Sequence, residues 1–235
     1  MRKYIQTLSS LLIPVLHSIG EFLTLFFWTA PKVAFFNYLE EKKVSRLFYK
    51  NKHFKKIDRA LLKAYRKKSP YKISKEFTSL HIYGETPLTL FHQIFQKGGL
   101  KKSDCFVDLG CGRGRGVLFA TSFWDCQSIG VDQIPFFCKE AEKIADTYKL
   151  SCQFHAEHLS DFNLSQGSFF YFYAICMEEE ELVFMISRLE RIRKGSKVVT
   201  VSFPLTDYSD SFSVCTSWKA AFPWGYGSVF LHIKQ

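Results

Sequence analysis

The chain has 235 residues, of which 47% are hydrophobic and 17% aromatic, and it carries a formal net charge of +10. This length is enough for one domain of ordinary size with an extension, whose core will be rich in phenylalanine. The seven cysteines form no C-x-x-C pair and are odd in number, which argues against a disulfide framework and a metal site. Cysteines without a disulfide framework favour a reducing, intracellular compartment.

Positive charge is concentrated in one segment. Residues 42–75 contain 14 Lys and Arg but a single acid, Asp58, so this segment carries +13 and the rest of the chain −3. The basic character therefore belongs to an extension and not to the whole protein.

Residues 1–40 form a mostly apolar segment. Its apolar run, residues 11–36, is interrupted by Pro14, Glu21 and Pro31. A charge such as Glu21 within a membrane-spanning helix costs about 2–3 kcal/mol, so an anchor at the membrane interface is favoured over a single span. Apolar helices packed on the domain are the third interpretation. The basic segment that follows would face anionic lipids, which predicts a cytoplasmic protein associated with the cytoplasmic face of a membrane.

Residues 41–77 form a basic segment in which apolar residues recur among the lysines. The spacing predicts one or two amphipathic helices, ending near Ser69 and Pro70. Three uses of the basic face stay open: a solvated surface, a membrane surface, or a nucleic-acid surface. The predicted organisation is an apolar segment at 1–40, a basic helical segment at 41–77, and a catalytic domain at 78–235.

A short polar loop precedes the next helix. Thr86 and Pro87 predict an N-cap and a first helical residue, and Gly98 and Gly99 predict the end of that helix. The loop itself contains the sequence Tyr-Gly-Glu-Thr at residues 83–86.

A glycine turn follows the first apolar strand, which is predicted at residues 105–109. Asp108 lies near the end of this strand, and a helix begins at about Arg115. The turn between them contains Gly110, Gly112 and Gly114, so a ligand can lie against bare backbone beside a helix N-terminus. The spacing does not fit G-x-G-x-x-G, which excludes the usual dinucleotide fingerprint.

This Asp-x-Gly-x-Gly-x-Gly pattern resembles motif I of the seven-strand, Rossmann-like S-adenosylmethionine (SAM) methyltransferases. Together with the Tyr-Gly-Glu-Thr loop it resembles the non-SET histone lysine methyltransferases. The Thr-Pro pair also resembles a small family that methylates lysine on ATP synthase subunit c and the adenine nucleotide translocase, whose members carry an apolar N-terminal segment. The resemblance covers about residues 82–203. It implies that SAM is the cofactor and that Tyr83, Gly84, Glu85 and Thr86 close over it.

The second and third strands are predicted at residues 127–131 and 152–155. Asp132 ends the second strand, where an acid suits the two hydroxyls of a ribose, and Gln133 would flank the adenosine. After the third strand the resemblance implies an acid at the adenine. The best match places His158 there with Glu157 beside it, while Asp161 and Phe162 remain an alternative.

The fourth strand, residues 169–173, is almost entirely aromatic, which is typical of a strand buried on both faces. The superfamily presents its target amine at the end of this strand, and here the sequence is Tyr-Ala-Ile-Cys at 173–176. The N-P-P-Y and D-P-P-Y motifs of base methylases are absent, and so is the Asn-rich sequence of the histone enzymes. Tyr173 is the predicted catalytic residue, by orienting the amine. The acids at 178–181 are predicted to favour a helix N-terminus.

A fifth strand is predicted at residues 197–202 and a final antiparallel pair at 212–218 and 228–234. Four aromatic residues between them form either a lip that binds a lysine side chain or an ordinary core: Trp218, Phe222, Trp224 and Tyr226. The predicted fold is α/β, a Rossmann-like, doubly wound, seven-stranded methyltransferase sheet with an α-helical apolar and basic N-terminal extension.

The resemblance thus implies a SAM-dependent enzyme, with protein-lysine N-methylation as the favoured reaction. The residues themselves offer no metal site. Methylation of RNA or of a small molecule is the alternative within enzymes. A SAM-binding, membrane-associated scaffold without catalysis is the alternative from another class. The expected partner is a protein lysine, followed by an anionic membrane surface and, less favoured, nucleic acid.

Overall fold

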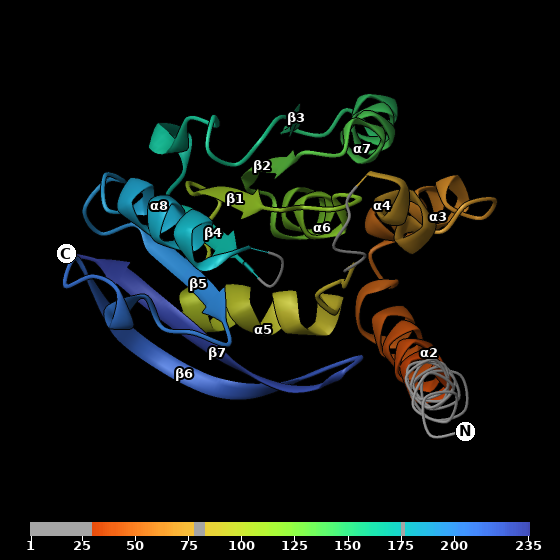
Figure 1. Ribbon diagram of the computed structural model, residues 1–235. Helices are drawn as coiled ribbons and strands as arrows, with labels where there is room; N and C mark the ends of the chain where they lie inside the picture. Colours follow the sequence, from red (N-terminus) through yellow and green to blue (C-terminus); the bar gives the residue numbers. More distant parts are fainter. Residues whose placement is uncertain (1–29, 78–82, 175–176) are drawn as a thin grey trace, which may run out of the picture.

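The computed structural model describes residues 30–77, 83–174 and 177–235, and its centre is a single seven-stranded sheet (Figure 1). The strand order is β3-β2-β1-β4-β5-β7-β6; β7 is antiparallel to both of its neighbours, and the other neighbouring strands are parallel. The strands are β1 (Cys105–Leu109), β2 (Gln127–Asp132), β3 (Cys152–Ala156), β4 (Phe169–Phe172), β5 (Lys197–Val201), β6 (Phe212–Phe222) and β7 (Gly225–Lys234). This arrangement confirms the predicted fold class.

Helices cover both faces of the sheet. Figure 1 shows α8 on one face and α5, α6 and α7 on the other, with α3 and α4 outside α6 and α7. Strand β4 lies between the two layers, and all four of its residues are buried, as its aromatic sequence predicts. The helices are α2 (Ala30–Phe48), α3 (Lys52–Ala64), α4 (Pro70–Phe77), α5 (Leu88–Gly98), α6 (Arg115–Trp124), α7 (Pro135–Tyr148) and α8 (Glu179–Leu189), with short 3-10 turns at Leu164–Gln166 and Leu205–Asp207.

The predicted strand and helix ends agree with the structure to within a few residues, with two differences. The final hairpin is longer than predicted, because β6 continues to Phe222 and β7 begins at Gly225. The predicted cap of α5 is wrong: this helix begins at Leu88, and Pro87 occupies the N-cap position without a side-chain hydrogen bond. Thr86 forms a tertiary hydrogen bond instead, with the hydroxyl of Tyr171 at 2.6 Å.

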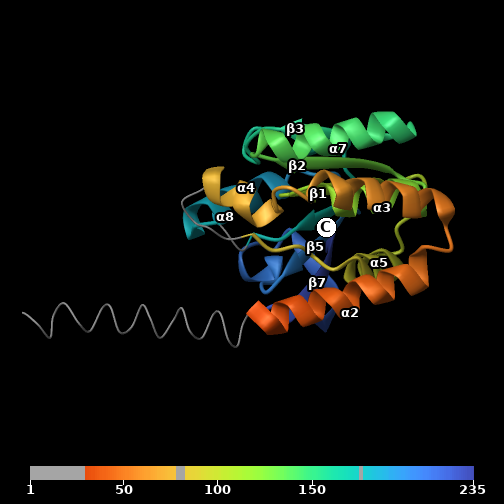
Figure 2. The ribbon, with the colours of Figure 1, turned by 90° about the vertical axis from the view of Figure 1, so that its right-hand side faces the viewer.

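The basic segment packs on the sheet domain through its apolar residues. In α3, Phe54, Ile57 and Leu61 are buried in the core that also contains α6 and α7. Phe48, at the end of α2, lies with its ring centroid 5.0 Å from that of Phe119 in α6. Figure 2 shows α3 against this layer and α2 running past α5. The predicted amphipathic segment is therefore helical, but it contains the end of α2, α3 and α4, and a helix begins at Pro70 where the segment was expected to end. Most of its lysines are exposed.

Within the described ranges no helix is both long enough and apolar enough to cross a bilayer. The predicted membrane anchor depends mainly on residues 1–29, which lie outside the described residues.

Candidate functional site

A cavity of about 460 Å³ lies at the carboxyl ends of β1, β2 and β4, where an open α/β sheet binds its ligands. This volume is typical of small-molecule sites. The cavity is lined by most of the predicted site residues: Tyr83, Gly84, Glu85, Thr86, Asp108, Gly110, Gly112, Asp132, Gln133, His158 and Tyr173. Two predicted residues, Gly114 and Glu157, are not among those that line it.

The glycine turn forms one wall of this cavity. The backbone N–H groups of Gly110 and Cys111 both donate to the carbonyl of Val131 at 2.9 Å, which fixes the turn to the end of β2. Gly112 has a φ of 52°, and a Cβ there would lie 3.2 Å from the Tyr83 hydroxyl. A larger residue at this position would therefore strain the backbone and push against the neighbouring loop.

Gly114 is required for close packing of the turn and not for the cavity wall. Its φ is 77°, and a Cβ would lie 2.5 Å from the ring of Phe154 and 3.0 Å from Ala141. Gly114 thus allows the start of α6 to approach β3 and α7 closely.

Asp132 fixes the turn from the other side. Its carboxylate accepts the N–H of Gly112 at 2.8 Å and that of Ile134 at 2.9 Å. Burial raises the pKa of Asp132, and these two hydrogen bonds oppose that rise by stabilising the ionised form. The carboxylate thus connects the glycine turn to the start of α7 while facing the cavity.

Asp108 is buried in the cavity wall at the end of β1. Burial, with a smaller contribution from Asp132, raises its pKa to about 8. Among the described residues its carboxyl group has no hydrogen-bond partner. A buried carboxyl group of this kind is unfavourable when ionised, and a cationic group in the cavity would stabilise it.

Because the pKa of Asp108 is higher in the folded chain than its ordinary 3.8, the wild type should lose stability as the pH rises from about 4 to 8. Asp108→Asn removes this penalty. We expect the free energy of unfolding of the variant to exceed that of the wild type by at least about 1 kcal/mol at about pH 8, and to be nearly equal to it near pH 4. Urea unfolding at both pH values, with the exposed Asp146→Asn as control, measures the difference. An equal advantage at both pH values would contradict the assignment.

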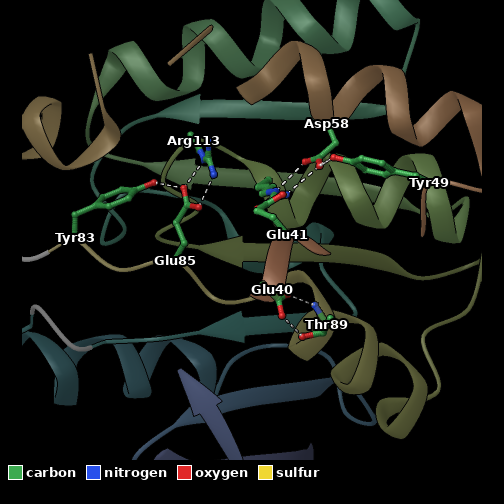
Figure 3. A network of polar contacts seen from close by, with 9 residues as sticks. Glu40, Glu41, Tyr49, Asp58, Tyr83, Glu85, Thr89 and Arg113 are labelled. Carbon is green, nitrogen blue, oxygen red and sulfur yellow. Dashed lines mark hydrogen bonds and ion pairs between the residues drawn. The ribbon is translucent and has the colours of Figure 1, made fainter. Parts of the chain in front are cut away.

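The loop at residues 83–86 is fastened to the glycine turn by an ion pair (Figure 3). The Tyr83 hydroxyl donates to Glu85 Oε1 at 2.6 Å, and Arg113 Nη2 donates to Glu85 Oε2 at 2.6 Å. Burial alone would raise the pKa of Glu85, but the charge and hydrogen bonds of Arg113 outweigh it and lower the pKa below the usual value. The guanidinium of Arg113 also lies over the ring of Tyr65, 5.7 Å from its centroid.

The loop after β3 places His158 at the cavity and turns Glu157 away. His158 Nδ1 lies 2.7 Å from Ser160 Oγ, and Leu159 beside it also lines the cavity. Glu157 faces His155, with Oε1 3.5 Å from Nδ1. Of the two residues predicted near the adenine, His158 is the one that the fold brings to the cavity.

Three aromatic rings gather next to the loop at the cavity, and we call them the aromatic slot: Tyr173, Phe222 and Trp224. Tyr173 follows β4 and lines the cavity, and its ring centroid lies 5.9 Å from that of Phe222 and 6.0 Å from that of Trp224. A Cβ on Gly84 would lie 2.7 Å from Trp224, so the loop passes directly against this ring.

The other two aromatic residues of the predicted lip are not part of the aromatic slot. Trp218 packs on the core beside Lys97, whose Nζ is 5.3 Å from the ring centroid. Tyr226 is 82% exposed.

Two arginines of the glycine turn, Arg113 and Arg115, also line the cavity, and sequence analysis did not single them out. Both are contained in the motif itself, Gly-Arg-Gly-Arg-Gly. Their partners come from distant segments, so the motif carries no signal of what they bind.

Comparison with curated proteins gives relatives over about half of the chain. The chain is 27% identical over 120 residues to the histone-lysine N-methyltransferase, H3 lysine-79 specific, of Emericella nidulans, and 26% identical to its Aspergillus fumigatus counterpart. The matches cover 51% of this chain but only 23% and 22% of those proteins. The chain thus spans about a quarter of the length of these relatives.

Solved structures share the fold. The RNA methyltransferase of Salinibacter ruber, solved with S-adenosyl-L-homocysteine, aligns over 64% of this chain and 94% of its own with a TM-score of 0.53 and 18% identity. The cyclase SpnF aligns over 63% of this chain and 80% of its own, with a TM-score of 0.54 and 12% identity. Since one of these proteins is described as a methyltransferase and the other as a cyclase, the fold alone does not fix the reaction.

A family model matches the part of the chain that contains the cavity. The model described as "Histone methylation protein DOT1" matches residues 62–185, which is more than half of the chain. The match runs from α3 through the loop, the glycine turn and β4 into α8, and so includes nearly every wall of the cavity. It confirms the resemblance to the non-SET histone lysine methyltransferases, and the chain therefore belongs to the DOT1 family.

Proposed function

We propose that this protein is a SAM-dependent methyltransferase that methylates a lysine side chain of a protein substrate. The observation that supports this most is the combination of two carboxyl groups, Asp108 and Asp132, around one glycine-walled cavity that adjoins the aromatic slot. The cavity with its two carboxyl groups suits the cofactor, and the aromatic slot suits the acceptor amine.

The residues of the cavity fit SAM. Asp108 is a buried carboxyl group with a raised pKa, and the cationic amino group of the methionine moiety would stabilise its ionised form. Asp132 offers carboxylate oxygens to the ribose hydroxyls, with Gln133 and His158 further along the same cavity. Glu85 does not compete for the ligand's positive charge, since Arg113 already pairs with it. Tyr83, Gly84 and Thr86 then cover the ligand.

When bound, SAM supplies a methyl group that its sulfonium makes electrophilic. The protein must present the acceptor nitrogen unprotonated and aligned. A free lysine has a pKa of about 10.4, and an apolar aromatic surround lowers it by disfavouring the charged form. The aromatic slot can also bind the apolar stem of lysine. We assign to the Tyr173 hydroxyl the role of orienting the amine, by accepting a hydrogen bond from one of its N–H groups. We assign positioning, and no general base, to this residue.

Two other functions compete. Methylation of RNA or of a small molecule needs the same cofactor site, but the base-methylase motif is absent after β4, where the chain continues with Tyr173 and Ala174. A scaffold that binds SAM without catalysis would show cofactor affinity but no methyl transfer to any acceptor.

The test is calorimetric titration of the full-length protein with SAM, followed by transfer of tritiated methyl groups to histone H3 and to a cell lysate. We expect micromolar binding and labelled methyl-lysine after hydrolysis of the protein fraction. Label in RNA or in small molecules would favour the first alternative, and binding without transfer would favour the scaffold. A folded protein that does not bind SAM would overturn the proposal.

We also propose that α2 lies against an anionic membrane surface, because its exposed side chains combine both requirements of an interfacial helix. Phe35, Tyr38 and Leu39 are 63%, 54% and 40% exposed, and exposed lysines 42 and 43 follow within the same helix. The full-length protein should float with vesicles of phosphatidylglycerol and phosphatidylcholine but not of phosphatidylcholine alone, and Phe35→Asp should weaken the association. A folded protein that stays unbound to both would contradict this proposal.

A further inference from the structure

Two neighbouring carboxylates on α2 bind the first residues of two different helices (Figure 3). Glu40 Oε1 accepts the backbone N–H of Thr89 at 2.9 Å, and Glu40 Oε2 accepts the Thr89 hydroxyl at 2.8 Å. Glu41 accepts two hydrogen bonds from the guanidinium of Arg115, at 2.6 and 3.1 Å. One turn of α2 therefore contacts both α5 and α6 near their starts.

Both helices begin beside the cavity, and neither has a side-chain cap of its own. Helix α5 starts directly after the loop at 83–86, with Pro87 at its N-cap, and α6 starts directly after the glycine turn, with Gly114 at its N-cap. The first N–H groups of a helix need acceptors, and a carboxylate there is favoured by the helix dipole. Glu40 supplies that carboxylate to α5 from a distant segment.

Arg115 is bound from two sides. Its Nε and Nη2 donate to the two carboxylate oxygens of Asp58 in α3, at 2.8 and 2.9 Å, and the Tyr49 hydroxyl donates to Asp58 at 2.8 Å. Burial opposes ionisation of Asp58, but Arg115 and Tyr49 outweigh it, and the pKa of Asp58 lies below its usual value. Arg115 is also one of the residues that line the cavity.

The two acids that bind Arg115 differ in exposure. The Asp58 side chain is 0% exposed, while that of Glu41 is 40% exposed. Arg115 would thus remain paired with Asp58 if α2 moved away, and the cost of losing a partly exposed pair is modest. Asp58 is the permanent partner, and Glu41 is the one that depends on the docking of α2.

We propose that Glu40 and Glu41 are positioning residues for the cofactor site, and that the docking of α2 is coupled to cofactor binding. This inference rests on the proposed function. Helix α2 contributes no residue to the lining of the cavity, so it acts through α5 and α6: at their starts by Glu40 and Glu41, and further along by Phe48. By linkage, whatever stabilises docked α2 raises cofactor affinity, and a bound cofactor stabilises docked α2 by the same factor.

The test compares Glu40→Gln, Glu41→Gln and the double variant with the wild type. Glu142→Gln, an exposed acid on α7, is the matched control because it removes the same charge away from the site. We expect the Kd for SAM to rise about tenfold in the double variant and to stay unchanged in the control. Hydrogen exchange supplies a second readout: SAM should slow exchange in residues 36–48 of the wild type, although α2 does not touch the cavity, and should not do so in the double variant.

Equal SAM affinity in the folded double variant and the wild type, or no effect of SAM on exchange in α2 of the wild type, would overturn the inference. If the double variant does not fold, Glu41→Gln alone decides the matter, since it leaves Arg115 paired with Asp58. Failure of the proposed function gives a different result, namely a wild type that binds no SAM. In that case exchange without ligand at residues 83–90 and 110–118, expected to be faster in the variants, still tests whether the two carboxylates position the cavity walls.

Discussion

Asp132→Ala should weaken SAM binding at least about 100-fold while leaving the chain folded, because the substitution leaves the N–H groups of Gly112 and Ile134 without their acceptor, at about 1–3 kcal/mol each. It also removes the carboxylate that we assign to the ribose. Both losses fall on the same wall of the cavity, so they reinforce each other. Calorimetric titration with SAM measures the affinity, and circular dichroism confirms the fold.

Two variants make this result interpretable. Asp132→Asn keeps one acceptor oxygen and should fall between wild type and alanine, since its amide cannot accept both backbone N–H groups as the carboxylate does. Asp146→Ala removes an exposed carboxylate from the end of α7 and should bind SAM normally. If Asp132→Ala bound SAM within threefold of the wild type, the cavity would not be the cofactor site.

Trp224→Ala should lower kcat/KM for the protein substrate about 5- to 10-fold with little change in the Kd for SAM. The indole lies in the aromatic slot, 6.0 Å from Tyr173 and 5.0 Å from Phe222 between ring centroids, and alanine opens the slot to water. Trp224 is 45% exposed, so loss of its ring face beside the positive charge that forms on the acceptor nitrogen in the transition state costs about 1 kcal/mol. Easier hydration of the amine before the reaction adds to this loss, because it favours the protonated, unreactive form.

Tyr226→Ala is the matched control, because this residue lies on the same hairpin but is 82% exposed. Its turnover should equal that of the wild type. Transfer of tritiated methyl groups to the protein acceptor identified for the wild type measures both variants. Normal turnover of the Trp224→Ala enzyme would show that the aromatic slot has no part in the reaction. A parallel loss of SAM affinity would show instead that Trp224 acts by supporting the loop at Gly84.

Local patterns predicted most of the fold. The strand with Asp108, the glycine turn and the helix from Arg115 follow from residues next to one another, and the structure has them where they were expected. The same is true of Asp132, whose place follows from strand order. These features depend on backbone geometry and on burial, which a short sequence window contains.

The features that were predicted wrongly or missed depend on contacts between residues that are distant in the sequence. Thr86 has the side chain of a helix cap, and nothing nearby in the sequence indicates that its hydroxyl bonds Tyr171. The composition of the basic segment does carry a signal for one such contact. Within residues 42–75, Asp58 is the one acid among 14 basic residues, and its partner is a buried cation elsewhere in the chain, Arg115.

The shared core of α3 and the sheet layer has a consequence for synthesis on the ribosome. Phe54 and Leu61 leave the ribosome early, whereas the α7 residues of that core, such as Phe137, are made about 80 residues later. At about 5–20 residues per second the apolar face of α3 stays without its α7 partners for roughly 4–16 s. Throughout that interval the nascent chain presents a hydrophobic surface flanked by positive charge, which makes early co-translational capture by a holding factor advantageous.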